Sequence, residues 1–172
     1  MSDTSLNREM MRDKVFLEIA VTLGQLGTCS RAQVGCVITR DGRAISWGYN
    51  GAPPGMPHCS ENNHGWEGLE DPAGILTNDY SPEEKKRWAD ELVVTHGCRN
   101  ATHAEANALA FAARQGISTD GGTLYVERSP CEACARLCIA AGITRAVFLV
   151  PYRDESGVTM LRNAGVEVEC LT

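Results

Sequence analysis

The sequence predicts a single α/β domain in which a mixed sheet of about five strands is covered by helices on both faces. The main observation is that, from residue 102 onward, segments with helical spacing of apolar residues alternate with short β-rich runs. An early β-hairpin and a length of 172 residues with 43% hydrophobic content agree with one domain. Strands separated by helices favour parallel pairing, and the hairpin adds an antiparallel edge.

The first half contributes one helix and the hairpin. An amphipathic helix is expected over residues 13–26, ending near Gly27. Its apolar residues recur at spacings near three and four: Val15, Phe16, Ile19, Ala20, Leu23 and Leu26. The runs 34–39 and 44–49 then flank Asp41-Gly42, which is a strong turn signal between strands.

The second half has a regular alternation of helices and strands, with no internal repeat. The expected order is helix 103–115, strand 123–127, helix 131–141, strand 145–150, helix 157–164 and strand 166–170. This alternation is typical of βαβ units, so the last three strands are expected to be parallel.

A long polar segment separates the two halves. It begins with a stretch rich in proline and glycine at 50–55 and reaches about residue 100. We therefore expect one domain over 1–172 with an insert at about 57–100. Within it, Ser81 as cap, Pro82 in the first turn and the acids Glu83 and Glu84 predict a short helix through Val94.

Composition excludes several classes of protein. A net charge of -6 argues against a broad basic face for nucleic acid. Eight cysteines in 172 residues fall below the roughly 8–10% of disulfide scaffolds, so clustered cysteines are better read as metal ligands. No apolar run reaches the roughly 18 residues of a membrane span. The polar, charged start is unlike a signal peptide, so a cytoplasmic protein is expected.

Two motifs carry the chemistry: His103-Ala104-Glu105 and Pro130-Cys131-Glu132-Ala133-Cys134. Cysteines three apart in the first turn of a helix project to one side, and the helix dipole there favours thiolates. His103 and Glu105 are two apart and cannot face each other on a helix. We therefore expect His103 to join the cysteines as a zinc ligand, while Glu105 carries protons beside the fourth, water-filled position.

Neither motif is specific alone. A Cys-x-x-Cys pair is often a structural zinc half-site or a redox pair, and a His-x-Glu is nearly uninformative. Together, in this order and with proline before the first cysteine, they match the signature of zinc nucleobase deaminases.

With these residues placed, the chain resembles the deoxycytidylate (dCMP) deaminase family of the cytidine deaminase superfamily. Besides the zinc motifs, the resemblance rests on 31–38, on 48–55 with its Gly-Tyr-Asn-Gly-x-Pro sequence, on His58-Cys59 and on 164–166. It implies a three-layer α/β/α cytidine deaminase-like fold. It also implies hydrolytic deamination of dCMP to dUMP with release of ammonia, supplying thymidylate synthesis. Glu105 would protonate N3 of cytosine and then the departing amine.

The same resemblance implies a set of substrate-binding residues: Val34, Asn50, Ala104, Ser129, Tyr152 and Arg31. Asn50 would contact the deoxyribose, Val34 would pack on the base, and the Ala104 N–H would hold the pyrimidine carbonyl. Tyr152 would close the pocket. Asparagine before glycine is also a common turn residue with no ligand.

For the phosphate, Arg31 is the first candidate, with Arg128 and Arg153 as the others. Guanidinium forks suit phosphate oxygens, although each arginine also fits an ordinary solvated surface position.

A second zinc is implied by the resemblance to phage and bacterial members. Its ligands would be Cys29, Cys59, His96 and Cys98, with His64 or His58 as substitutes for one of them. The His-x-Cys spacing departs from other members, which leaves the fourth ligand open. Such a closed structural site would anchor the long insert, which would otherwise be mobile.

The resemblance further implies a homohexamer that dCTP with Mg²⁺ activates and dTTP inhibits. The allosteric residues would be Gly48, Tyr49, Gly51 and Gly55. Cys36, Cys138 and Cys170 lie in apolar patterns and are expected in the core.

The sequence leaves other functions open. Deaminases of dCTP, of 5-substituted dCMP or of free cytidine share the zinc motif. A tRNA adenosine deaminase is disfavoured by the acidic balance and the Asn50 segment. A catalytically silent zinc module is disfavoured because it would not need Glu105.

Overall fold

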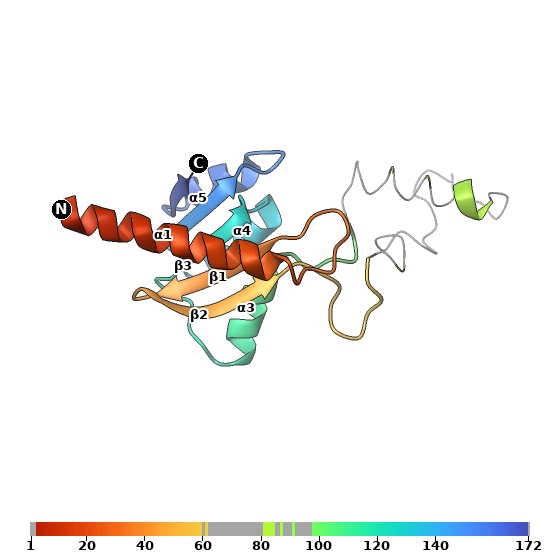
Figure 1. Cartoon of the computed structure of the whole chain (residues 1–172), viewed down its shortest axis with the longest axis horizontal. Helices are drawn as coiled ribbons and strands as arrows, with labels where there is room; N and C mark the ends of the chain where they lie inside the picture. The colour runs from red at the N-terminus through yellow and green to blue at the C-terminus, as the bar shows by residue number, and fades with distance from the viewer. Residues whose placement is uncertain are drawn as a thin grey trace. The chain divides into compact units, whose positions relative to one another are not determined.

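The computed structural model describes residues 3–59, 61, 81–84, 87, 91 and 98–171 (Figure 1). The chain forms two compact units. The first comprises Met1–Gly27, Ala32–Asn50 and His103–Thr172, and the second comprises Thr28–Arg31 and Gly51–Thr102. In the described part of the chain, no helix combines the length and the apolar character needed to cross a bilayer.

The first unit is built on one five-stranded sheet with the order β2-β1-β3-β4-β5. The strands are β1 (Gly35–Arg40), β2 (Arg43–Tyr49), β3 (Thr123–Arg128), β4 (Arg145–Val150) and β5 (Glu167–Cys170). β1 pairs antiparallel with both β2 and β3, whereas β3, β4 and β5 are parallel. The predicted mixed sheet with an antiparallel edge is confirmed.

The β1–β2 hairpin turns at the predicted Asp-Gly pair. Arg40 pairs with Arg43, and the two residues between them have positive φ, 51° at Asp41 and 70° at Gly42. This is the two-residue type I′ geometry, which matches the right-handed twist of the strands. Glycine adopts it without strain and aspartate tolerates it, so the local sequence fixes the hairpin.

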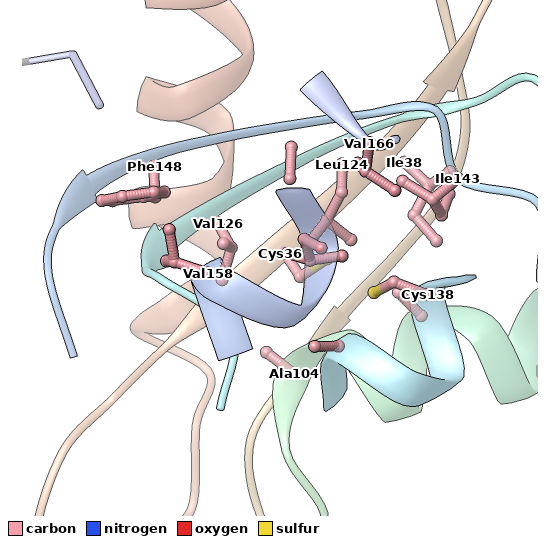
Figure 2. Close-up of a cluster of buried hydrophobic side chains, with 14 residues drawn as sticks. Cys36, Ile38, Ala104, Leu124, Val126, Cys138, Ile143, Phe148, Val158 and Val166 are labelled. Atoms are coloured by element: carbon pink, nitrogen blue, oxygen red, sulfur yellow. The ribbon is translucent and has the colours of Figure 1, made fainter. Parts of the chain in front are cut away.

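Helices cover both faces of the sheet, as predicted. α1 (Asp3–Gly24) packs on one face, while α3 (Ala104–Arg114), α4 (Glu132–Ala140) and α5 (Ser156–Asn163) pack on the other. Side chains alternate accordingly along the strands. Val37, Tyr125 and Val147 pack with α1, and their neighbours form the larger core of Cys36, Ile38, Leu124, Val126, Ala146 and Phe148 (Figure 2). Most predicted ends of these helices and strands differ from the structure by one residue.

α1 departs from its prediction. It begins at Asp3 and ends at Gly24, so the predicted start at residue 13 and end near Gly27 are wrong. Val15 and Ile19 are 43% and 40% exposed, whereas Leu17 and Ala20 are buried. The helix therefore has an inner apolar stripe and an outer one that includes Met11. Spacing predicts a helix, but it does not tell which of two stripes meets the sheet.

Asp13 is a buried polar residue on the side of α1 that faces the sheet. Its carboxylate accepts hydrogen bonds from Arg145 (2.8 and 2.9 Å) and from the Tyr125 hydroxyl (2.7 Å). Arg145 also pairs with Glu169 of β5. Burial alone would raise the pKa of Asp13, but the bonds from Arg145 and Tyr125 outweigh it and lower the pKa below 3.8. One ionic cluster thus ties α1 to three strands.

The second unit contains the start of the predicted insert helix. Residues 82–84, 87 and 91 are helical. The Ser81 hydroxyl accepts the Glu84 N–H (3.3 Å), and the Glu84 carboxylate accepts the Ser81 N–H (2.8 Å). This reciprocal pair is a capping box, so the predicted serine cap is confirmed. Part of the helix predicted through Val94 lies outside the described residues.

Asp13→Asn is expected to destabilise the protein by about 3 kcal/mol at neutral pH, because it leaves the Arg145 charge without its main partner. A carboxyl whose pKa is lowered in the folded state contributes stability above the unfolded pKa, and this stability is lost as pH falls through the lowered value. Urea unfolding should therefore show a gap between variant and wild type that narrows below about pH 3.8. Glu18→Gln on the exposed side of α1 is the control, and an equal loss in both variants would contradict the role of Asp13.

Candidate active site

The structure brings together His103, Cys131 and Cys134. The His103 Nδ1 atom lies 3.5 Å from the Cys131 sulfur and 3.4 Å from the Cys134 sulfur. The three ligand atoms all lie within 4.8 Å of one another. Residues that are 28 and 31 positions apart in sequence thus converge on one point.

This geometry fits zinc. Bonds of about 2.3 Å to sulfur and about 2.0 Å to nitrogen, at a tetrahedral angle, separate nitrogen from sulfur by about 3.5 Å. Two thiolates and one imidazole are a soft ligand set that zinc prefers, and three protein ligands leave the fourth position for water.

Helix starts position the ligands. His103 is the N-cap residue of α3 and Cys131 is the N-cap residue of α4, with extended backbones at ψ 155° and 169°. Neither side chain makes a capping hydrogen bond to its own helix, so the imidazole and the thiol are available to the shared cluster. Cys134 follows in the first turn of α4. The partial positive charge at a helix start favours the thiolate form of both cysteines.

A hydrogen bond joins the two cysteine thiols. The hydrogen bond from the Cys134 thiol lowers the pKa of Cys131 to about 4, and the same bond raises the pKa of Cys134. The lowered pKa favours the thiolate form of Cys131. A zinc ion would displace the remaining proton and bind both sulfurs as thiolates.

Glu105 lies in the first turn of α3, next to this cluster but outside its three ligands. Its side chain is 5% exposed. Burial raises the pKa of the carboxyl, although the nearby His103 and a hydrogen bond involving Cys134 oppose the change. A carboxyl whose pKa is raised toward neutrality is suited to take and return a proton.

The side-chain amide of Asn50 is hydrogen-bonded to the backbone on both sides of residue 33. Its Oδ1 accepts the Val34 N–H (2.9 Å), and its Nδ2 donates to the Ala32 carbonyl (2.7 Å). The amide thus fixes the backbone that carries Val34, which packs against the larger core. The predicted deoxyribose contact would use the second N–H of the same amide.

Ser129 and Tyr152 are joined by a hydrogen bond that the sequence did not predict. The buried Ser129 hydroxyl accepts the Tyr152 N–H (2.7 Å), and the Ser129 N–H donates to the Val150 carbonyl (2.9 Å). The Arg153 guanidinium lies 5.4 Å from the centre of the Tyr152 ring. Ser129 therefore shapes the loop after β4, whatever contact it makes with substrate.

Sequence reasoning missed the residues that hold β2 on α3. The Asn107 amide donates to the Tyr49 carbonyl (2.7 Å), and the Ser46 hydroxyl donates to the Ala108 carbonyl (2.6 Å). Gly48 lies so close to α3 that an added Cβ would be 2.6 Å from the Ala104 carbonyl oxygen. Asn107 is one turn after His103, and this polar residue on the sheet side of a helix was the signal available.

The phosphate candidates are not brought together by described contacts. Arg128 and Arg153 are exposed residues of the first unit. Arg31 belongs to the second unit, so its contact with phosphate stays a prediction.

A second group of cysteines forms within the second unit. The ligand atoms of Cys29, Cys59 and Cys98 lie within 4.8 Å of one another, and the Cys59 and Cys98 sulfurs are 3.5 Å apart. Asn100 and the Ala101 N–H hydrogen-bond to these two sulfurs. His96 and His64 lie outside the described residues, and His58 is exposed. The 3.5 Å between the Cys59 and Cys98 sulfurs is close to the tetrahedral value of about 3.8 Å, so this group too could hold a metal.

The three cysteines outside these two groups differ in burial. Cys36 and Cys138 are fully buried in the larger core, as predicted, whereas Cys170 is exposed on the edge strand β5, so its predicted core position is wrong. The apolar pattern predicted burial, but β5 lies at the edge of the sheet, where a strand has only one neighbouring strand to cover it. None of the eight cysteines, all of them within the described residues, forms a disulfide.

The fold and the ligand group together define a zinc-binding α/β protein of the cytidine deaminase-like type. The dCMP deaminase from the cyanophage S-TIM5, solved in complex with dCMP and dUMP, has the same fold. It matches with a TM-score of 0.68 at 24% identity, over 99% of each chain.

Sequence comparison is more specific. Residues 10–150 match the cytidine and deoxycytidylate deaminase zinc-binding region. The deoxycytidylate deaminase of enterobacteria phage T4 is 37% identical over 172 aligned residues, covering 92% of this chain and 89% of that protein. That of Mycobacterium phage D29 is 40% identical over 136 residues, covering 79% and 92%. The chain belongs to the cytidine and deoxycytidylate deaminase family.

Proposed function

We propose that this chain is a zinc-dependent deaminase that converts dCMP to dUMP with release of ammonia, supplying dUMP for thymidylate synthesis. The observation that carries the proposal is the meeting of His103, Cys131 and Cys134 beside the buried Glu105. Two relatives that match most of the chain are deoxycytidylate deaminases, and the S-TIM5 enzyme of the same fold binds dCMP and dUMP.

The three ligands would hold zinc, which supplies Lewis-acid activation of water for attack on C4 of cytosine. Glu105 would take a first proton from the attacking water and pass it to N3 of the ring. It would then take the second proton, from the hydroxyl that the water leaves on C4, and pass it to the departing amine. Both protons of the water are thus accounted for and ammonia leaves. Burial of Glu105 raises its pKa, which suits it to hold the proton between these steps.

Substrate orientation follows from the backbone near the metal. Ala104 is the first residue of α3, and N–H groups in a first turn have no partner within the helix. This supports the Ala104 N–H as donor to the pyrimidine carbonyl. Asn50 holds the backbone of Val34, so the base and sugar contacts proposed for these residues share one support. Tyr152 would close the pocket, Ser129 would be a further substrate-binding residue, and Arg31 is the proposed phosphate ligand.

Glu105→Gln is expected to lower dCMP turnover by about 10²- to 10⁴-fold while zinc stays bound, because the amide keeps the shape but cannot carry protons. Ammonia release and zinc content are measured on the same preparation. Cys138→Ala, one turn beyond the ligands in α4, is the control and should keep both. Full activity in the Gln variant with zinc present would contradict the mechanism.

The identity of the substrate is tested by parallel assays with dCTP, 5-methyl-dCMP, cytidine and a tRNA stem-loop. Turnover of one of these compounds, with no turnover of dCMP, would contradict dCMP as the substrate.

We also propose a structural zinc in the second unit, bound by Cys29, Cys59 and Cys98 with His96 as fourth ligand. The ligand atoms of these three cysteines already lie within 4.8 Å of one another. A closed site of this kind would join the two ends of the insert, since Cys59 follows its start and Cys98 precedes its end. Such thiols would stay reduced in the cytoplasm, where we place the protein.

Two zinc ions per chain are expected by elemental analysis of gently purified protein. Cys98→Ser should lose one zinc and lower the thermal stability, because metal binding contributes to folding. Cys134→Ala should instead lose the other zinc together with the deaminase activity. A single zinc in the wild type that survives Cys98→Ser would contradict the second site.

Finally, we propose that the chain assembles as a homohexamer regulated by dCTP with Mg²⁺ and by dTTP, through the region of Gly48, Tyr49, Gly51 and Gly55. The outer stripe of α1 supports self-association, because Met11, Val15 and Ile19 expose 60%, 43% and 40% of their surfaces on one helix face.

Val15→Glu combined with Ile19→Glu is expected to shift the protein to a smaller species in sedimentation velocity, since charges would enter an apolar contact. Lys14→Glu, on the same helix, is the matched charge control. An unchanged sedimentation coefficient in the double variant would contradict a role of α1 in the interface.

The proposed regulation is tested by saturation curves with dCMP. Curves that stay the same when dCTP with Mg²⁺ or dTTP is added would contradict the regulation.

A further inference from the structure

Gly157 lies in the first turn of α5, pressed against the backbone of the Pro-Cys motif. A Cβ atom at this position would be 2.0 Å from the Pro130 carbonyl oxygen and 2.7 Å from the Cys131 carbonyl carbon. These are main-chain atoms, which cannot turn aside as the end of a side chain can. Gly157 is not among the glycines with positive φ, so its requirement is one of space.

The peptide that Gly157 touches is the start of α4. The Cys131 carbonyl accepts the Ala135 N–H (2.8 Å), which is the first hydrogen bond of that helix. On the other flank, Ser129 is fixed by the Val150 carbonyl and the Tyr152 N–H. The Pro130–Cys131 turn is therefore held between the loop after β4 and the first turn of α5.

We propose that Gly157 is a positioning residue of the catalytic metal centre. By letting α5 approach the Pro130–Cys131 peptide, it keeps the Cys131 sulfur 3.5 Å from the His103 nitrogen, within reach of one zinc ion. A side chain at 157 displaces this peptide and moves one thiolate ligand relative to the other two. The inference rests on the proposed zinc chemistry and adds a residue that contacts neither metal nor substrate.

The chain offers a matched control in Gly35. A Cβ there would be 1.9 Å from the Ala20 carbonyl oxygen and 2.5 Å from the Gly24 nitrogen, again main-chain atoms. Gly35 packs against α1 on the opposite face of the sheet. Gly35→Ala and Gly157→Ala therefore introduce comparable crowding, and only the second crowds a zinc ligand.

The test measures thiol alkylation of the zinc-loaded protein by iodoacetamide, located by mass spectrometry of peptides. In Gly157→Ala, Cys131 is expected to react about 10- to 100-fold faster than in the wild type, since loss of support for a metal ligand lowers metal affinity by about that factor and leaves the thiolate open to alkylation. Cys36, which is fully buried in the core, reports global opening and should stay protected. In Gly35→Ala, any rise at Cys131 should be no greater than the rise at Cys36.

Wild-type reactivity of Cys131 in Gly157→Ala, or a rise equal to that of Cys36, overturns the proposal. If Gly157→Ala does not fold, Val158→Ala loosens the same turn of α5 without adding bulk. It should expose Cys131 ahead of Cys36, and an equal rise overturns the proposal. The proposed function fails separately: a wild type that protects Cys131 with zinc but leaves dCMP unchanged refutes the substrate and not the role of Gly157.

Discussion

The N-termini of α3 and α4 meet at one point, and this meeting sets the geometry of the candidate metal site. His103 and Cys131 are both N-cap residues, and each leaves its own helix uncapped by its side chain. The candidate metal ligands therefore sit where helix dipoles favour thiolates and where first-turn N–H groups have no partner within the helix. Any change in the relative position of α3 and α4 would alter the distances among His103, Cys131 and Cys134 and the place of Glu105 together.

Contacts with the sheet and with α5 hold the N-termini of α3 and α4 in place. β2 is joined to α3 through Ser46, Asn107 and the close approach at Gly48, while α5 supports the start of α4 at Gly157. On the opposite face, the ionic cluster of Asp13 and Arg145 ties α1 to the strands. Small residues and side-chain hydrogen bonds to the backbone thus fix the helices that carry the site.

The two cysteine groups show how similar residues serve different ends. The group of Cys131 and Cys134 includes a histidine and has a buried carboxyl beside it, which suits an open, catalytic site. The group of Cys29, Cys59 and Cys98 lies within the second unit, and each sulfur comes from a different loop segment. Such an arrangement suits a closed site that joins loops without taking part in the reaction.

The metal chemistry and the order of helices and strands could be inferred from the amino-acid sequence, because ligand type, spacing, turn residues and caps act within a few residues of one another. The Asp41-Gly42 turn, the Ser81 cap and the distinct roles proposed for His103 and Glu105 all follow from such local rules. The three-dimensional packing was needed to learn which stripe of α1 meets the sheet, why Asp13 is buried, what Asn50 supports and why position 157 is glycine. Each depends on contact with a segment distant in the chain, and periodicity carries no information about the partner.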